Sequence, residues 1–182
     1  MDLQASQERK REIMDKSKKR LIVINGKGGV GKDTLCGFAG KYYRVRNVSS
    51  ITPIKEIAAA YGWKGEKTPK ARKFLADLKE AFTQYNDLPT SYLFQQYQEF
   101  SAGEEELMFV HIREGREIDK LKEKIPNQCI TLLIKRPLEG IETWGNASDD
   151  EVEQYSYDYV YENTKPLEAA EEDFLSFLKR IL

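Results

Sequence analysis

The sequence predicts a three-layer α/β fold, in which helices cover both faces of a five-stranded parallel sheet. Apolar segments of strand length alternate along the chain with longer segments whose apolar residues recur at helical spacing. The first strand, Leu21 to Ile24, is apolar throughout, as expected where both faces of a parallel sheet are buried. The chain has 182 residues, which is enough for one ordinary domain with a core of its own.

The expected elements follow from the positions of these segments. We expect strands at residues 21–24, 45–49, 107–112, 129–134 and 158–161. We expect helices at residues 33–44, 54–61, 68–85, 91–101, 117–124 and from 167 onwards. Thr68 and Pro69 mark one helix start, because threonine is a good N-cap and proline suits the first helical position.

Residues 1–20 are expected to form a charged arm ahead of the domain at 21–182. The arm is rich in Lys, Arg, Glu and Gln and has no apolar run like that of a secretory signal. A solvated helix, a partly disordered segment and an interaction helix all fit this composition. The whole chain has 29 basic and 30 acidic residues and no apolar stretch of membrane-spanning length, so we expect neither nucleic acid nor a membrane as partner. Cys36 and Cys129 lack metal-site spacing, which favours a reducing, cytoplasmic setting.

A glycine-rich loop follows the first strand and opens the first helix. Its residues are Gly26, Lys27, Gly28, Gly29, Val30, Gly31, Lys32, Asp33 and Thr34. A glycine, four residues and then Gly-Lys is the spacing of the P-loop, whose backbone N–H groups surround phosphates while the lysine reaches the terminal ones. The following helix N-terminus adds further donors for anions. The loop therefore predicts a P-loop NTPase fold that binds ATP, with Lys32 as a catalytic cation.

Asp33 stands where the common motif has serine or threonine, and Thr34 is displaced by one position. In the common motif that hydroxyl is a ligand of Mg²⁺. Two interpretations of Asp33 remain open. Its carboxylate holds the metal ion, directly or through water, or it only interacts favourably with the helix N-terminus.

With its Gly-Lys-Asp ending, the loop resembles those of two groups of small-molecule kinases, the phage deoxynucleoside-monophosphate kinases and the animal phosphomevalonate kinases. Ile54-Lys55-Glu56 and the segment from Thr68 to Arg72 are similar to further segments of these kinases. The resemblance implies that Lys55 and Arg72 bind the acceptor, within inserted helices at about residues 52–103. It also implies a lid-like segment at about residues 137–156.

Charged residues follow two more strands, at the sheet edge where open α/β folds bind ligands. They are Arg113 and Glu114 after one strand, and Lys135 and Arg136 after another. Phosphoryl transfer needs cations near the developing charge, so we take Arg113 and Arg136 as catalytic candidates and Glu114 as support for Mg²⁺. Ordinary solvent-exposed charges explain these residues equally well.

Aromatic residues and a single histidine accompany these candidates. We expect His111 to be structural, because this chemistry does not require a general base. Core packing is also the expected role of the aromatic side chains at residues 85–100, although stacking of an acceptor base is an alternative.

Three functions fit these observations. The favoured one is ATP- and Mg²⁺-dependent phosphoryl transfer to a small phosphorylated acceptor, with a nucleoside or deoxynucleoside monophosphate as first candidate. A regulatory ATPase, in which Lys27 acts across a homodimer, fits less well because Asp33 replaces a threonine and the strand at 45–49 has no aspartate. A nucleotide-binding protein without catalysis also remains open, because residues 137–157 contain no Lys or Arg.

Overall fold

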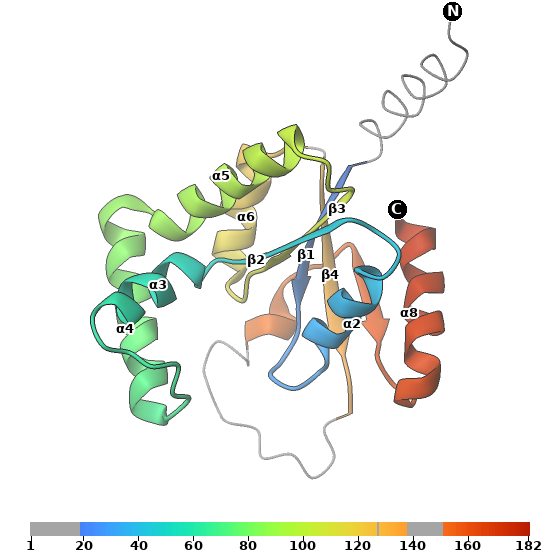
Figure 1. Ribbon diagram of the computed structural model, residues 1–182, viewed down its shortest axis with the longest axis horizontal. Coiled ribbons are helices and arrows are strands. Elements are labelled where there is room, and N and C mark those ends of the chain that lie inside the picture. Colours follow the sequence, from blue (N-terminus) through green and yellow to red (C-terminus); the bar gives the residue numbers. More distant parts are fainter. Residues whose placement is uncertain (1–18, 127, 138–150) are drawn as a thin grey trace, which may run out of the picture.

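The expected three-layer α/β architecture is confirmed by the computed structural model, which describes residues 19–126, 128–137 and 151–182 (Figure 1). The strands are β1 (Arg20–Asn25), β2 (Val45–Ser49), β3 (Leu107–His111), β4 (Cys129–Lys135) and β5 (Tyr159–Glu162). The helices are α2 (Lys32–Ala39), α3 (Thr52–Ala60), α4 (Pro69–Asn86), α5 (Leu88–Ala102), α6 (Gly115–Lys124) and α8 (Leu167–Ile181), with a 3-10 turn η1 at Val152–Gln154. Most of the expected arm and of the lid-like segment lie outside the described residues.

All described strands are parallel and form one sheet in the order β2-β3-β1-β4-β5. Strand β1 is central, between β3 and β4, and residues 21–25 are completely or almost completely buried. Parallel strands end at a common edge, so the segments that follow β1, β3 and β4 meet there. This edge lies at the bottom of Figure 1.

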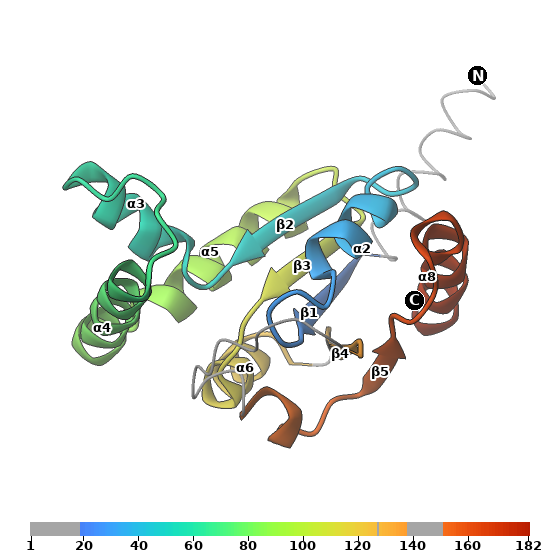
Figure 2. The same ribbon diagram turned by 90° about the horizontal axis from the view of Figure 1, so that it is seen from below.

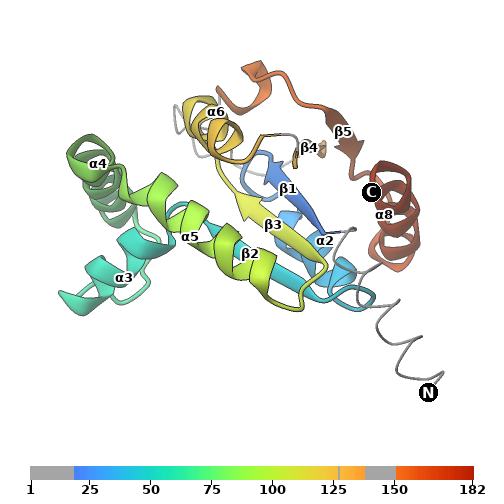
Figure 3. The same ribbon diagram turned by 90° about the horizontal axis from the view of Figure 1, so that it is seen from above.

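Successive residues of β1 alternate between two cores, one on each face of the sheet. Ile22 and Ile24 pack with buried residues of α2 and α8, among them Leu35 and Phe174. Leu21 and Val23 belong to the core on the other face, which includes buried residues of α5 and α6. Figures 2 and 3 show the same division, with α2 and α8 on one face and α5 and α6 on the other.

Helices α3 and α4 form a separate unit beside the sheet. Their small core contains Ile54, Ala58 and Leu75, and in Figure 2 both helices stand at the end of α5 that is remote from α8. The expected cap of α4 is confirmed, because the hydroxyl oxygen of Thr68 accepts a hydrogen bond from the N–H of Ala71 at 3.2 Å.

Three expectations from the helical patterns are wrong in detail. Helix α2 ends at Ala39 and not near residue 44, because Gly40 begins a turn that leaves Tyr42 exposed. Helix α5 begins at Leu88 and not at residue 91, because Asp87 takes a left-handed conformation that ends α4 and starts α5. Tyr85 is 84% exposed and so is no core residue, because it is not among the residues that pack in any of the three hydrophobic cores.

Candidate phosphate-binding site

Three glycines of the loop between β1 and α2 have a positive φ, and Gly29, at +82°, is one of them. Gly26 has a φ of +149° and Gly31 a φ of +94°, conformations that residues with side chains rarely adopt. A Cβ atom on Gly26 would lie 2.6 Å from the carbonyl oxygen of Ile134, and one on Gly31 would lie 2.7 Å from Nδ2 of Asn163. The loop backbone therefore lies tightly against β4 and the segment after β5, which fixes its path.

Helix α2 begins directly after Gly31. The N–H of Leu35 donates to the carbonyl oxygen of Gly31 at 3.0 Å, so the N–H groups of residues 32–34 precede the helical hydrogen-bond ladder. Donors in this position, together with the helix dipole, attract anions. Asp33 and Thr34 are exposed in the same turn. The loop thus presents backbone donors for an anion, with a carboxylate beside them.

The side chain of Lys32 lies over its own loop. Its ammonium donates hydrogen bonds to the carbonyl oxygen of Gly26 and, at 2.9 Å, to that of Lys27. A positive charge is therefore already present at the mouth of the loop. A bound phosphate would replace the two carbonyl oxygens as its partner, because hydrogen bonds between ionised groups are the stronger ones.

Sequence reasoning missed Asn25, the last residue of β1 and almost wholly buried. Its Oδ1 accepts a hydrogen bond from the N–H of Gly26 at 2.8 Å, and its Nδ2 donates to the carbonyl oxygen of Arg113 at 3.1 Å and to the hydroxyl of Tyr157 at 2.8 Å. One amide therefore joins the start of the loop, the end of β3 and the segment before β5. The sequence did contain one signal for this role, because Asn25 is a polar residue directly after the apolar run of residues 21–24.

Asn163, which follows β5, was missed as well. Its Nδ2 donates to the carbonyl oxygen of Val30 at 2.8 Å, and its own N–H donates to the carbonyl oxygen of Lys135 at 2.7 Å. The side chain is buried and supports the loop from the β5 side. No local sequence pattern predicts this contact, because Val30 and Asn163 are far apart in the chain.

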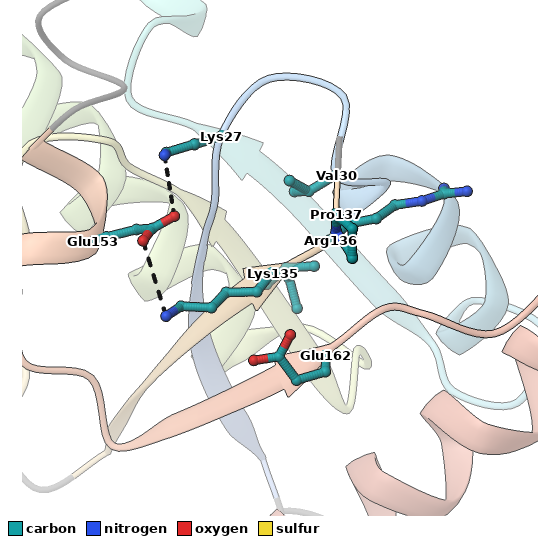
Figure 4. Close-up of a pocket in the computed structure, with 8 residues that line it drawn as sticks. Lys27, Val30, Lys135, Arg136, Pro137, Glu153 and Glu162 are labelled. Carbon is teal, nitrogen blue, oxygen red and sulfur yellow. Dashed lines mark ion pairs between the residues drawn. The ribbon is translucent and has the colours of Figure 1, made fainter. Parts of the chain in front are cut away.

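A pocket of about 220 Å³ opens beside the loop, next to the end of β4. Its charged lining residues are Lys27, Lys135, Arg136, Glu153 and Glu162. Nζ of Lys27 lies 3.2 Å and Nζ of Lys135 lies 3.9 Å from the carboxylate of Glu153. Figure 4 shows both lysines extending toward Glu153, whereas Arg136 points away from it. The structure therefore gathers two of the predicted cations around an acid that sequence reasoning did not single out.

Arg136 also lines a second, smaller pocket of about 80 Å³ between α2 and the segment after β5. Thr34, Phe38 and Lys165 contribute to the same pocket. Gly31 of the loop also lines this smaller pocket. Arg136 lines both pockets and therefore lies between them.

At the end of β3, Glu114 is already paired. The buried ammonium of Lys79, from α4, lies 2.7 Å from Glu114 and 2.9 Å from Glu117. Burial acts to raise the pKa of Glu114, but the charge and hydrogen bond of Lys79 outweigh it and hold that pKa below its ordinary value. For Glu117 burial dominates and raises the pKa. This cluster joins α4 to the sheet edge beside Arg113.

The two residues expected to bind the acceptor lie on the α3–α4 unit. Lys55 is exposed on α3, and Arg72 is exposed near the start of α4, where its Nε donates to the carbonyl oxygen of Lys67 at 3.1 Å. Both belong to the unit that stands beside the sheet in Figure 2, and the guanidinium of Arg72 bonds within its own segment.

His111 has the partners of a structural histidine. Its Nε2 lies 2.7 Å from Oδ1 of Asn47, and burial lowers the pKa of its ring. Burial also raises the pKa of the Cys36 and Cys129 thiols to about 12, so neither is poised as a nucleophile.

Membrane-spanning helices and carboxylate-rich metal clusters are both absent from the described part of the chain. Residues 19–126, 128–137 and 151–182 contain no helix that is long and apolar enough to cross a membrane. Within the same ranges, no three His, Cys, Asp or Glu side chains are grouped as ligands of a metal ion. Asp33 and Glu114 therefore do not belong to a ready-made carboxylate cluster.

No family model matches the chain, and comparison with curated proteins gives no match. Solved structures do share its fold. A thymidylate kinase from Candida albicans is 14% identical with a TM-score of 0.52, over 90% of this chain and 92% of that chain. A shikimate kinase from Aquifex aeolicus is 14% identical with a TM-score of 0.53, over 87% of this chain and 96% of that chain. The chain therefore has the fold of these kinases, and identity this low shows the fold alone.

Proposed function

We propose that this protein is an ATP- and Mg²⁺-dependent kinase that transfers a phosphate to a small phosphorylated acceptor. Nucleoside and deoxynucleoside monophosphates are the first candidates for that acceptor. The observation that carries the proposal is the loop: glycines at Gly26 and Gly31 that leave no room for a Cβ atom, directly before a helix N-terminus, with the ammonium of Lys32 over the loop. Such a loop suits a chain of phosphates.

The two pockets suggest how ATP would lie. The smaller pocket, between α2 and the segment after β5, would receive the base, with the planar guanidinium of Arg136 against it. The phosphates would run from there along the loop toward Lys32 and Lys27. Both lysines, and Lys135 in the larger pocket, would then lie near the charge that develops during transfer.

Asp33 fits the role of a magnesium ligand better than Glu114 does. Asp33 is exposed in the first turn of α2, beside the loop, and a carboxylate is a ligand that Mg²⁺ accepts. The carboxylate of Glu114 is held by Lys79, so it would support the ion only through water. Bound Mg²⁺ supplies positive charge that neutralises the phosphates.

The acceptor would bind between the sheet edge and the α3–α4 unit. Arg72 offers a bidentate fork for a phosphate, and Lys55 offers a second positive charge. Arg113 follows β3, the strand beside β1, so it would approach the transferred phosphate from the acceptor side. Closing α3 and α4 toward the loop would bring these cations to a common ligand.

One contact favours the kinase over a dimeric ATPase switch. Lys27 forms its ion pair with Glu153 of the same chain, so a partner subunit is not needed to engage it. We therefore propose that Lys27 acts within one chain.

The test is ADP formation from Mg²⁺-ATP in the presence of a panel of nucleoside monophosphates and other small phosphorylated acceptors. We expect one acceptor to raise ADP formation well above the rate with ATP alone, and Lys32→Ala to abolish that rise. ATP binding without stimulation by any acceptor would contradict the proposal. An ATP-dependent dimer that is lost in Lys27→Ala would instead support the switch.

A further inference from the structure

The carboxylate of Glu153 lies between two lysines in the pocket beside the phosphate loop. It is 3.2 Å from Nζ of Lys27 on the P-loop and 3.9 Å from Nζ of Lys135 at the end of β4 (Figure 4). Both lysines line the larger pocket beside the loop. We infer that Glu153 is an internal competitor for the phosphates of the nucleotide, which occupies Lys27 and Lys135 before binding and again as ADP leaves. This inference rests on the proposed function.

The backbone next to Glu153 is held by contacts other than those with the two lysines. Its neighbour Val152 is completely buried, and the carbonyl oxygen of Val152 accepts a hydrogen bond from the hydroxyl of Tyr157 at 2.8 Å. That hydroxyl also accepts a hydrogen bond from Asn25, the residue immediately before Gly26. The backbone that carries Glu153 is therefore tied to the first residue of the phosphate loop, and the acid is held beside the loop by its own segment.

The strength of the contacts suits a competitor that can be displaced. The side chains of Lys27, Lys135 and Glu153 are about two-fifths exposed, at 38%, 40% and 42%. Exposed ion pairs contribute little to stability because water screens them. The phosphates of a nucleotide carry more negative charge than one carboxylate, and they also bind the loop N–H groups, so they replace Glu153 at the lysines.

The acid would matter most for product release. Lys27, Lys32 and Lys135 would all attract ADP, and tight binding of product slows turnover. A carboxylate that returns to Lys27 and Lys135 lowers the affinity for ADP without touching the reacting atoms. Residues 137–157 contain no Lys or Arg, so this segment adds no positive charge at the phosphates. Lys27, Lys32 and Lys135 would supply that charge instead.

The experiment compares Glu153→Gln with a matched control in the same pocket. Glu162 lines that pocket and forms no ion pair with another described residue, so Glu162→Gln removes the same charge without removing a contact to either lysine. We would titrate the wild type and both variants with Mg²⁺-ADP by calorimetry, without acceptor. The thermal midpoint of each variant confirms that it is folded.

We expect Glu153→Gln to bind ADP about twofold to about tenfold more tightly than the wild type, because each exposed ion pair contributes a factor of about 1.5 to about 5 and the longer pair, at 3.9 Å, is the weaker one. We expect dissociation of ADP to slow by a similar factor, and Glu162→Gln to bind within about twofold of the wild type. The gain should be smaller when Glu153→Gln is combined with Lys27→Ala.

Two results would overturn the inference while leaving the kinase proposal intact. One is unchanged or weaker binding of ADP by Glu153→Gln when the wild type binds ADP. The other is an equal gain in ADP affinity in Glu162→Gln, which would mean that removing any negative charge from the pocket has this effect. Failure of the wild type to bind any adenine nucleotide would overturn the proposed function and the inference together.

Discussion

Oδ1 of Asn25 accepts a hydrogen bond from the N–H of Gly26 at 2.8 Å, so the last buried residue of β1 fixes the first residue of the phosphate loop. The amide nitrogen of the same side chain donates to the carbonyl oxygen of Arg113 and to the hydroxyl of Tyr157. Three segments that converge on the proposed site are thereby held at one point. The path of the loop depends on a buried polar side chain as well as on its glycines.

The first prediction concerns Asn25. Replacing it with Ala leaves the N–H of Gly26 and the carbonyl oxygen of Arg113 without their buried partner, so we expect a loss of about 2 kcal/mol in the free energy of unfolding. We also expect the Kd for ATP to rise. Tyr157→Phe removes one bond of Asn25 together with the bond to the carbonyl oxygen of Val152, and should cost about 1 to about 2 kcal/mol. Denaturant unfolding and nucleotide titration measure both effects, and an Asn25→Ala variant with wild-type stability and ATP affinity would contradict this role.

The second prediction compares two glycines near the loop. Gly31→Ala forces a side chain into a φ of +94° and places its Cβ 2.7 Å from Nδ2 of Asn163, so we expect it to abolish nucleotide binding and to destabilise the protein by at least about 1 kcal/mol. Gly37 lies within α2, where an added Cβ would meet no neighbouring side chain within 4 Å, so Gly37→Ala should raise stability by up to about 1 kcal/mol. Thermal unfolding measures the stability of both variants, and a change of the same sign in the two would contradict the prediction.

The third prediction concerns the buried ammonium of Lys79. Lys79→Met removes the charge that faces Glu114 and Glu117, so we expect the free energy of unfolding at pH 7 to fall by about 3 kcal/mol. On the same helix, Lys73 forms an exposed pair with Asp77, so Lys73→Met should change stability by less than about 0.5 kcal/mol. Chemical denaturation at one pH gives the free energy of unfolding of both variants. An equal loss of stability in the two would contradict the claim that burial makes the Lys79 pair the stronger one.

The same cluster predicts a dependence on pH. In the wild type the pKa of Glu114 is below its ordinary value of 4.5, so its contribution to stability is present above that value and is lost as the pH falls through the lowered pKa. Without Lys79 its charge and hydrogen bond no longer offset burial, which is the largest cause at both carboxyls, so both pKa values should rise. A raised carboxyl pKa contributes stability that is lost as the pH rises. The deficit of Lys79→Met relative to the wild type should therefore shrink as the pH falls from 7 toward 4.5. A deficit that grows over this range would contradict the assignment.

The fourth prediction separates the two interpretations of Asp33. If Asp33 holds the magnesium ion, Asp33→Asn should lower kcat by about an order of magnitude or more and raise the Mg²⁺ concentration needed for activity. If the carboxylate only interacts with the start of α2, the variant should lose about 0.5 kcal/mol of stability and keep its kcat. We expect the first outcome, measured as rate against Mg²⁺ concentration together with thermal unfolding.

The sequence was most informative where a feature is local. The apolar run from Leu21 to Ile24 and the spacing of Gly26, Gly31 and Lys32 are contained within a few residues, and the strand, loop and helix follow in the expected order. The start of α4 at Thr68 and Pro69 was equally readable, because a cap depends on neighbours in the chain.

The contacts that complete the site are not local. Glu153 reaches Lys27, Asn163 reaches Val30 and Lys79 reaches Glu114 only after the chain has folded, so no spacing in the sequence signals them. The exposure of Tyr85 has a similar origin. Its helical spacing predicts burial, but burial also needs a neighbouring element on that side of α4, and spacing says nothing about neighbours.

In the proposed function, the loop holds ATP for transfer of its terminal phosphate to a phosphorylated small molecule. The most direct measurement follows ³²P from the γ-phosphate of ATP into a panel of nucleoside and deoxynucleoside monophosphates and other small phosphorylated acceptors, with the wild type and Lys32→Ala. We expect one labelled acceptor with the wild type and none with Lys32→Ala. Release of label only as inorganic phosphate, or no release while ATP remains bound, would contradict the claim.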